Sequence, residues 1–69
     1  EALIVYPNPV VDKININKNV DINVFNYIGG MVISKNNTNV LDVSILSSGI
    51  YTLQITYNNK LITKKIIKK

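Results

Sequence analysis

The segment from Tyr51 to Tyr57 alternates strictly between apolar and polar side chains. Such alternation predicts a β-strand with one buried face and one solvent-facing face. Asn58 and Asn59 follow, and asparagine tolerates the left-handed backbone conformation that two-residue hairpin turns require. Residues 60–67 then supply a second strand. We therefore predict a β-hairpin, and the rest of the sequence is interpreted around it.

A two-residue turn fixes the register of this hairpin by placing Tyr57 opposite Lys60. The pairs that follow are Ile55 with Ile62, Gln54 with Thr63, Leu53 with Lys64, Thr52 with Lys65, Tyr51 with Ile66, and Ile50 with Ile67. One face then carries Tyr51, Leu53, Ile55, Ile62 and Ile66, and the other carries a small apolar patch of Ile50 and Ile67 among lysines. A three-residue loop would pair Tyr57 with Leu61 and turn Ile67 inward, because a one-residue slip exchanges the faces. We favour the first register.

The length and composition of the sequence predict a single, modestly stable domain. A chain of 69 residues buries only roughly 60% of the surface that its unfolded form exposes. It contains no Cys and no His, so disulfides and the usual ligands of structural zinc are missing. Apolar residues make up 46% of the chain, with a bias towards Val and Ile that favours sheet over helix.

The remaining sequence reads as short strands separated by turns. We expect strands at residues 3–6, 12–17, 20–25, 31–33 and 40–43, in addition to the two strands of the hairpin. The expected connections are a rigid corner at residues 7–9, a turn at 17–19, a turn at Gly29 and Gly30, a polar loop at 36–39 and a crossover at 44–48. This pattern predicts an all-β fold, a small immunoglobulin-like antiparallel β-sandwich of about seven strands.

The net charge of +4 is concentrated at one end of the sequence. Four of the eight lysines lie in residues 64–69, and the chain has no arginine. Because Arg is better suited to phosphate and base recognition, and no aromatic residue lies among the terminal lysines, we expect no nucleic-acid partner. The lysines are interpreted as protection of a strand edge against aggregation. No run of 18 apolar residues occurs, so we expect no membrane-spanning helix.

The sequence offers little for catalysis or metal binding. General acid-base chemistry needs titratable groups that converge, but the chain has three Asp, one Glu and no His. Asp12, Asp21 and Asp42 do not match the spacing of a calcium loop, and the serines at 44, 47 and 48 lack a base to activate them. We therefore expect no enzyme activity, no cofactor and no metal. A start at Glu1 without a secretion signal is interpreted as a fragment of a longer protein.

Five short motifs occur in order along essentially the whole chain. The residues that make up these motifs are Tyr6, Pro7, Asn8, Pro9, Asp12, Gly29, Gly30, Leu46, Gly49, Ile50, Tyr51, Lys64, Lys65, Ile67 and Lys68. Together with Leu41 to Ser44, they resemble the type A C-terminal sorting domain of the bacterial type IX secretion system (Por secretion system C-terminal domain). The chain departs from that pattern at Met31, where a basic residue commonly follows the glycine turn.

This resemblance implies a non-catalytic signal at the end of a longer secreted protein from a Gram-negative bacterium of the Bacteroidota. The upstream cargo would enter the periplasm with a cleaved signal peptide. Shuttle proteins and the outer-membrane translocon would then recognise the domain, and a sortase-like cysteine protease would remove it outside. The cargo would be attached to anionic lipopolysaccharide at the cell surface or released.

Two other functions remain open from the sequence. An immunoglobulin-like accessory module that binds polysaccharide or another surface ligand needs exposed aromatic side chains along a groove. Tyr51 and Tyr57 are predicted to face the core, which leaves Tyr6, Phe25 and Tyr27. The other alternative is a structural spacer, and the position of the domain in its parent gene distinguishes it, because a sorting signal must end the protein.

Overall fold

The computed structural model describes residues 2–69, and these residues form five β-strands and no helix. The strands are β1 (Val5–Tyr6), β2 (Lys13–Phe25), β3 (Met31–Asp42), β4 (Gly49–Tyr57) and β5 (Lys60–Lys68). They pair antiparallel in one sheet of order β1-β2-β4-β5, with β3 paired to β2 off this path. The predicted all-β antiparallel class is confirmed. The predicted seven-strand sandwich is not, because the structure is a single sheet curled into a half-barrel.

The two strands lost from the prediction are merged into their neighbours. Residues 17–19, predicted as a turn, lie inside β2, and residues 36–39, predicted as a loop, lie inside β3. The pairing of β2 with β3 shifts register in these regions. Such shifts bend and twist a strand without ending it. Asn37 takes a φ of 50° at one such shift, and its N–H donates to Asp21 Oδ1 at 2.8 Å.

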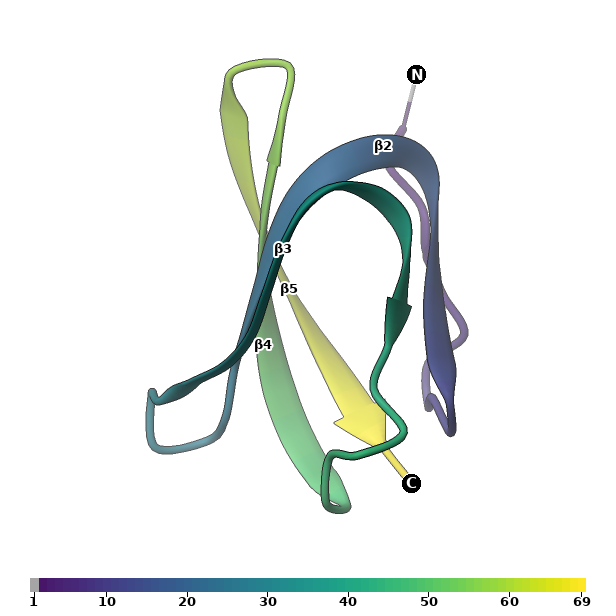
Figure 1. Cartoon of the computed structure of the whole chain (residues 1–69), viewed down its shortest axis with the longest axis vertical. Helices are drawn as coiled ribbons and strands as arrows, with labels where there is room; N and C mark the ends of the chain where they lie inside the picture. Colours follow the sequence, from purple (N-terminus) through teal and green to yellow (C-terminus); the bar gives the residue numbers. More distant parts are fainter. Residues whose placement is uncertain (1) are drawn as a thin grey trace.

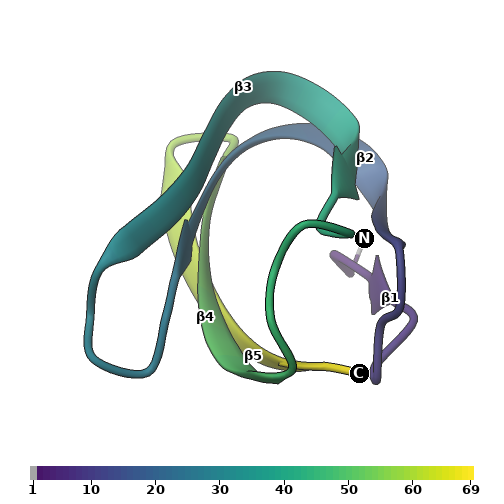
Figure 2. The ribbon, with the colours of Figure 1, turned by 60° about the horizontal axis from the view of Figure 1, so that its bottom comes forward.

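The bend in β2 allows one sheet to enclose a core. The first part of β2 pairs with β1 through Asn15 and Ile16, and its last part pairs with β4 from Asp21 to Phe25. β3 follows β2 along most of this arch, as Figures 1 and 2 show. The arch therefore covers the side of the core that the second layer of a sandwich would cover.

The core is made by the side chains on the inner face of the arch. Those of β2 keep a strict period of two over the bent strand, as expected for a strand with one face buried. The buried apolar residues are Val10, Ile14, Ile16, Val20, Ile22, Val24, Leu41, Val43, Tyr51, Leu53, Ile55 and Ile66. Leu3, Val5, Ile33, Leu46, Tyr57 and Ile62 pack against them while staying partly exposed.

The β4–β5 hairpin has the predicted register throughout, from Tyr57 opposite Lys60 to Ile50 opposite Ile67. Its turn residues Asn58 and Asn59 have φ angles of 55° and 62°, as a two-residue primed turn requires. The three-residue alternative is thereby excluded. In the β2–β3 turn the positive φ of 88° belongs to Gly29 and not to Gly30.

Candidate functional site

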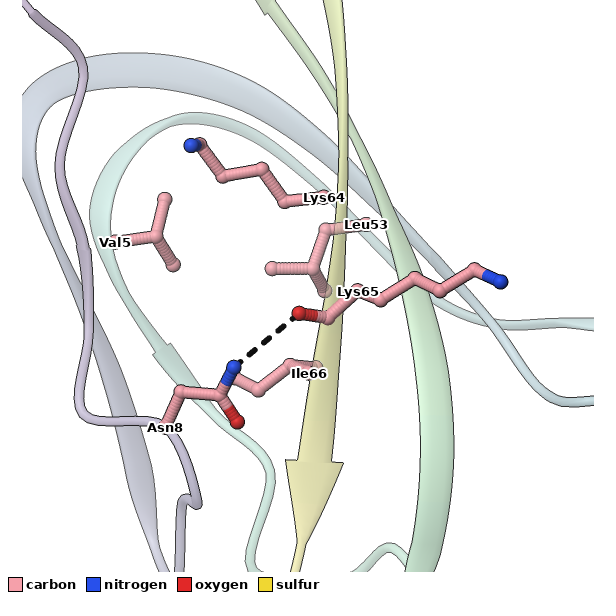
Figure 3. A pocket seen from close by; sticks show the side chains of 6 residues that line it. All are labelled: Val5, Asn8, Leu53, Lys64, Lys65 and Ile66. Carbon is pink, nitrogen blue, oxygen red and sulfur yellow. Dashed lines mark hydrogen bonds between the residues drawn. The ribbon is translucent and has the colours of Figure 1, made fainter.

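The outer edge of the C-terminal strand is held by the side chain of Asn8. Asn8 Oδ1 accepts a hydrogen bond from the Ile67 N–H at 3.0 Å, and its Nδ2 donates to the Lys65 carbonyl at 3.3 Å. Figure 3 shows the second of these bonds. The amide side chain thus satisfies two backbone groups of β5 as an adjacent strand would. The flanking peptide bonds Tyr6-Pro7 and Asn8-Pro9 are both cis.

The backbone of Val10 continues this attachment towards the end of β5. Val10 N–H donates to the Ile67 carbonyl at 2.8 Å, and Lys69 N–H donates to the Val10 carbonyl at 2.9 Å. These bonds form a parallel bridge between Val10 and Lys68. We call residues 8–10 together with residues 65–69 the clasp. It closes the half-barrel at the end where β5 finishes (Figure 2).

Tyr51 fastens the crossover that leads into β4. Its ring is buried, and its hydroxyl donates to the Ser47 carbonyl at 2.7 Å while lying 3.2 Å from Ser47 Oγ. Leu46 of the same crossover packs against the core. The start of β4 is thus fixed next to the end of β5, where Gly49 lies opposite Lys68. Gly49 has a φ of 155°, a conformation that side chains of L-residues rarely adopt.

Lys68 does not face outward as predicted. It is 8% exposed and lies on the inner face, and its Nζ donates to the Lys69 carbonyl at 2.8 Å. The prediction was wrong because a lysine can bury its long aliphatic stem along apolar side chains while its ammonium keeps a polar partner. Lys65 and Lys69 are exposed, as expected of residues on the outer face.

The outer apolar patch predicted from the register is present. Ile50 is 56% and Ile67 48% exposed, and the two are directly opposite in the β4–β5 ladder. A shallow groove of about 400 Å³ adjoins Ile50 and is lined by Phe25 and Tyr27 as well as by Lys65. No local pattern in the sequence indicates that the β2–β3 turn brings these aromatic side chains beside β4, because the strand order and the curl of the sheet decide their position.

Most of the predicted motif residues fall into two groups in space. Those at 6–9, 49–51 and 64–68 meet around the clasp, and Leu46 joins them through the crossover. Gly29 and Gly30 instead form the β2–β3 turn, where Asn26 Oδ1 accepts hydrogen bonds from the N–H groups of Ile28 and Gly30. Asp12 acts through its backbone, since its carbonyl accepts from Val43 N–H at 2.8 Å.

Two carboxylates, those of Asp21 and Asp42, accept hydrogen bonds at a bulge and at a turn. Asp42 Oδ1 accepts from the Ser44 N–H at 2.9 Å. Hydrogen bonding by the side chain and backbone of Ser44 holds the pKa of the Asp42 carboxyl below its ordinary value. Across residues 2–69, no three acidic side chains gather as a metal site would require. These residues also include no helix of the length and apolar character needed to cross a membrane.

These features define a small all-β domain that presents strand edges and an exposed apolar patch. A profile of the family described as "Secretion system C-terminal sorting domain" matches residues 4–69. The chain belongs to this family of type IX secretion sorting domains, which confirms the resemblance found in the motifs. A comparison with curated proteins gives no significant match. Domains of this family are sorting signals and in general non-catalytic.

Proposed function

We propose that this domain carries an upstream cargo protein from the periplasm through the outer membrane by presenting its terminal strand to the type IX translocon and its shuttle proteins. Membership of the family supports the general role, namely export to the cell surface or extracellular space with the help of that machinery. The clasp is the observation that carries the finer proposal. It ties the end of β5 to residues 8–10 by four hydrogen bonds, so the terminal lysines and the Ile50/Ile67 patch are held in a fixed arrangement.

A fixed arrangement matters because recognition of a flexible tail would cost conformational entropy on binding. An ordered strand with exposed Lys65 and Ile67 avoids that cost and can be recognised behind unrelated cargo proteins. After export, a sortase-like cysteine protease cuts the chain before the domain and releases or anchors the cargo. The residues that we assign to recognition are therefore those around the clasp, and Gly29 and Gly30 have a structural role.

The test fuses the whole chain to a periplasmic reporter in a host with a type IX secretion system. We expect extracellular reporter in that host and none in a strain lacking the translocon, with the reporter alone as a second control. Mass spectrometry of the exported reporter tests removal of the domain, and a strain lacking the sortase should retain the uncut fusion. Equal export with and without the translocon would contradict the proposal.

The groove lined by Phe25 and Tyr27 favours one alternative, an accessory module that binds a carbohydrate surface ligand. Tyr27 is 87% exposed, and aromatic rings of this kind provide stacking surfaces for apolar faces of ligands. The fusion experiment separates the two functions. A Tyr27→Ala variant should be exported normally if the domain is a sorting signal. Loss of polysaccharide binding with unchanged export would assign the groove to a second function.

A further inference from the structure

Between the clasp and the β4–β5 turn, β5 and β1 face each other without pairing. No Cα atom of β1 lies within 8 Å of a Cα atom of β5, whereas hydrogen-bonded neighbouring strands lie about 4.8 Å apart. One missing strand between two others would place them about 9.5 Å apart on the same spacing. We call the space between residues 3–6 and residues 60–65 the seam. Figure 3 shows its lower end, where Asn8 joins β5.

The seam contains two clefts that lie end to end along β5. One of about 270 Å³ is lined by Val5 of β1 and by Leu53, Lys64 and Ile66. The other, of about 300 Å³, is lined by Leu3 and by Ile62 near the β4–β5 turn. In both clefts one wall comes from the N-terminal segment and the other from the hairpin. Polar and charged groups line both clefts together with inward apolar side chains, among them Val5 in the first and Ile62 in the second.

Backbone polar groups of both strands point into the seam. In β5, Ile67 and Lys69 direct their N–H groups away from β4 to Asn8 and Val10, so in the unbroken β4–β5 register Leu61 and Thr63 direct theirs the same way. In β1, the Ile4 carbonyl accepts from Asn17 of β2, so the groups of Val5 point away from β2. Among residues 2–69, no strand is paired to either of these edges.

Among the described residues, the charged side chains that line the seam are lysines. Lys64 is half-buried on the inner face, and its side chain reaches from β5 towards β1 (Figure 3). Lys18 and Lys60 line the second cleft. No carboxylate of the described residues lines either cleft. An occupant would therefore need an extended backbone, apolar side chains to meet Val5 and Ile62, and an acidic side chain opposite Lys64.

We propose that the seam receives an extended segment of the export machinery by strand addition, with an acidic side chain of that segment against Lys64. This inference rests on the proposed function and adds the seam to the surface around the clasp as a second recognised part of the domain. Strand addition gives affinity through backbone hydrogen bonds and specificity through side-chain pockets. The clasp limits the insertion, because it already occupies the edge of β5 from Lys65 onward.

The test uses the reporter fusion with variants in the seam and matched controls outside it. Lys64→Glu reverses the seam charge, Lys64→Arg keeps it, and Lys35→Glu makes the same reversal on exposed β3. Thr63→Pro removes an edge N–H that the β4–β5 ladder does not use, and Thr63→Ala removes only the side chain. Melting temperatures are measured for all variants. If the melting temperature of Lys64→Glu falls by more than about 5 °C, roughly 1 kcal/mol, Lys64→Gln replaces that variant. A Thr63→Pro variant destabilised to the same extent is left out of the comparison.

We expect Lys64→Glu and Thr63→Pro to lower extracellular reporter at least about tenfold, the change that ~1.4 kcal/mol of recognition free energy produces. The three controls should stay within about twofold of the parent, which corresponds to ~0.4 kcal/mol. Export of the folded seam variants at the parental level would overturn the inference and leave the proposed function standing. If the parent fusion itself is not exported through the translocon, the proposed function fails first.

Discussion

The backbone N–H of Ile67 donates to Oδ1 of Asn8 at 3.0 Å, although the two residues are 59 positions apart in the sequence. The same amide side chain donates to the carbonyl of Lys65, so one asparagine copies the hydrogen bonding of a neighbouring strand. The end of β5 therefore depends on a segment from the start of the chain. This arrangement of β5 needs both ends of the domain to fold together.

Asn8→Ala should destabilise the domain by about 1–2 kcal/mol, because two hydrogen bonds to exposed backbone are lost and each is worth roughly 0.5–1.5 kcal/mol. Asn8→Asp is the matched control, since it keeps the acceptor for Ile67 and loses the donor for Lys65. Its stability should fall between those of the parent and the alanine variant. Urea unfolding measures all three, and equal stability of parent and Asn8→Ala would show that the side-chain bonds of Asn8 contribute nothing.

Tyr51→Phe isolates the hydroxyl that fastens the crossover. The ring stays in the core, while the hydrogen bond to the Ser47 carbonyl is lost, so we expect a loss of about 1 kcal/mol. Tyr27→Phe removes a hydroxyl from a side chain that is 87% exposed and should leave the melting temperature unchanged. Thermal unfolding followed by circular dichroism compares them. A helical or disordered spectrum of the parent would contradict the fold itself.

The hairpin could be predicted in full because its register depends on local information. Tyr57 to Lys60 fixes a two-residue turn, and every pair up to Ile50 opposite Ile67 follows from it. The side chain of Lys68 is the exception. Period two places it inward beside Ile66, but its charge suggested the opposite face, and only the contacts of its stem decide the outcome.

The sequence also indicates that β2 is continuous, because its apolar residues keep the same alternation on both sides of residues 17–19. Ile14, Ile16, Val20, Ile22 and Val24 are all buried and all occupy even positions, so no turn interrupts the alternation. The polar composition of residues 17–19 concealed this. β3 carries no comparable signal. Its inward residues change phase at the bulge, which is why composition alone predicted a loop there.

The parts of the site that could not be predicted are those made by distant segments. Asn8 could be recognised as part of a motif, but nothing local indicates that its amide pairs with β5. The seam is also non-local, because its width depends on how far the bend in β2 carries β1 away from β5. The contact of Asn8 with β5 and the width of the seam both depend on how the whole sheet curls, which the sequence of a single strand does not determine.

Gly49→Ala tests backbone strain with little steric effect. A Cβ atom at Gly49 would meet no heavy atom within 4 Å, but the φ of 155° is unfavourable for alanine. We expect a loss of about 1 kcal/mol from this cause. Ser48→Ala, at the neighbouring exposed position, is the control and should change stability by less than about 0.5 kcal/mol. The same melting temperature for Gly49→Ala and the parent would refute the strain.

The carboxyl of Asp42 makes the stability depend on pH. Because its pKa is lowered in the folded state, the ionised form stabilises the fold above the unfolded value of about 3.9, and this contribution is lost as the pH falls through the folded pKa. The difference in unfolding free energy between the parent and Asp42→Ala should therefore be constant above about pH 5 and shrink below about pH 4. Ser44→Ala should show a weaker pH dependence than the parent, since Ser44 is the main cause of the shift.

The two faces of β5 should separate under mutation, because Ile66 is 3% and Ile67 48% exposed although the two are adjacent. Ile66→Ala removes buried methyl groups and should cost about 2–5 kcal/mol, so export fails through unfolding. Ile67→Ser changes a solvent-facing residue and should change stability by less than about 0.5 kcal/mol.

If the translocon binds the outer patch, export of the Ile67→Ser and Lys65→Ser fusions should nevertheless fall. Thr56→Ser is a control on the same outer face, away from the patch. Melting temperature and extracellular reporter are measured together, and normal secretion of both folded variants would remove the outer patch from the signal.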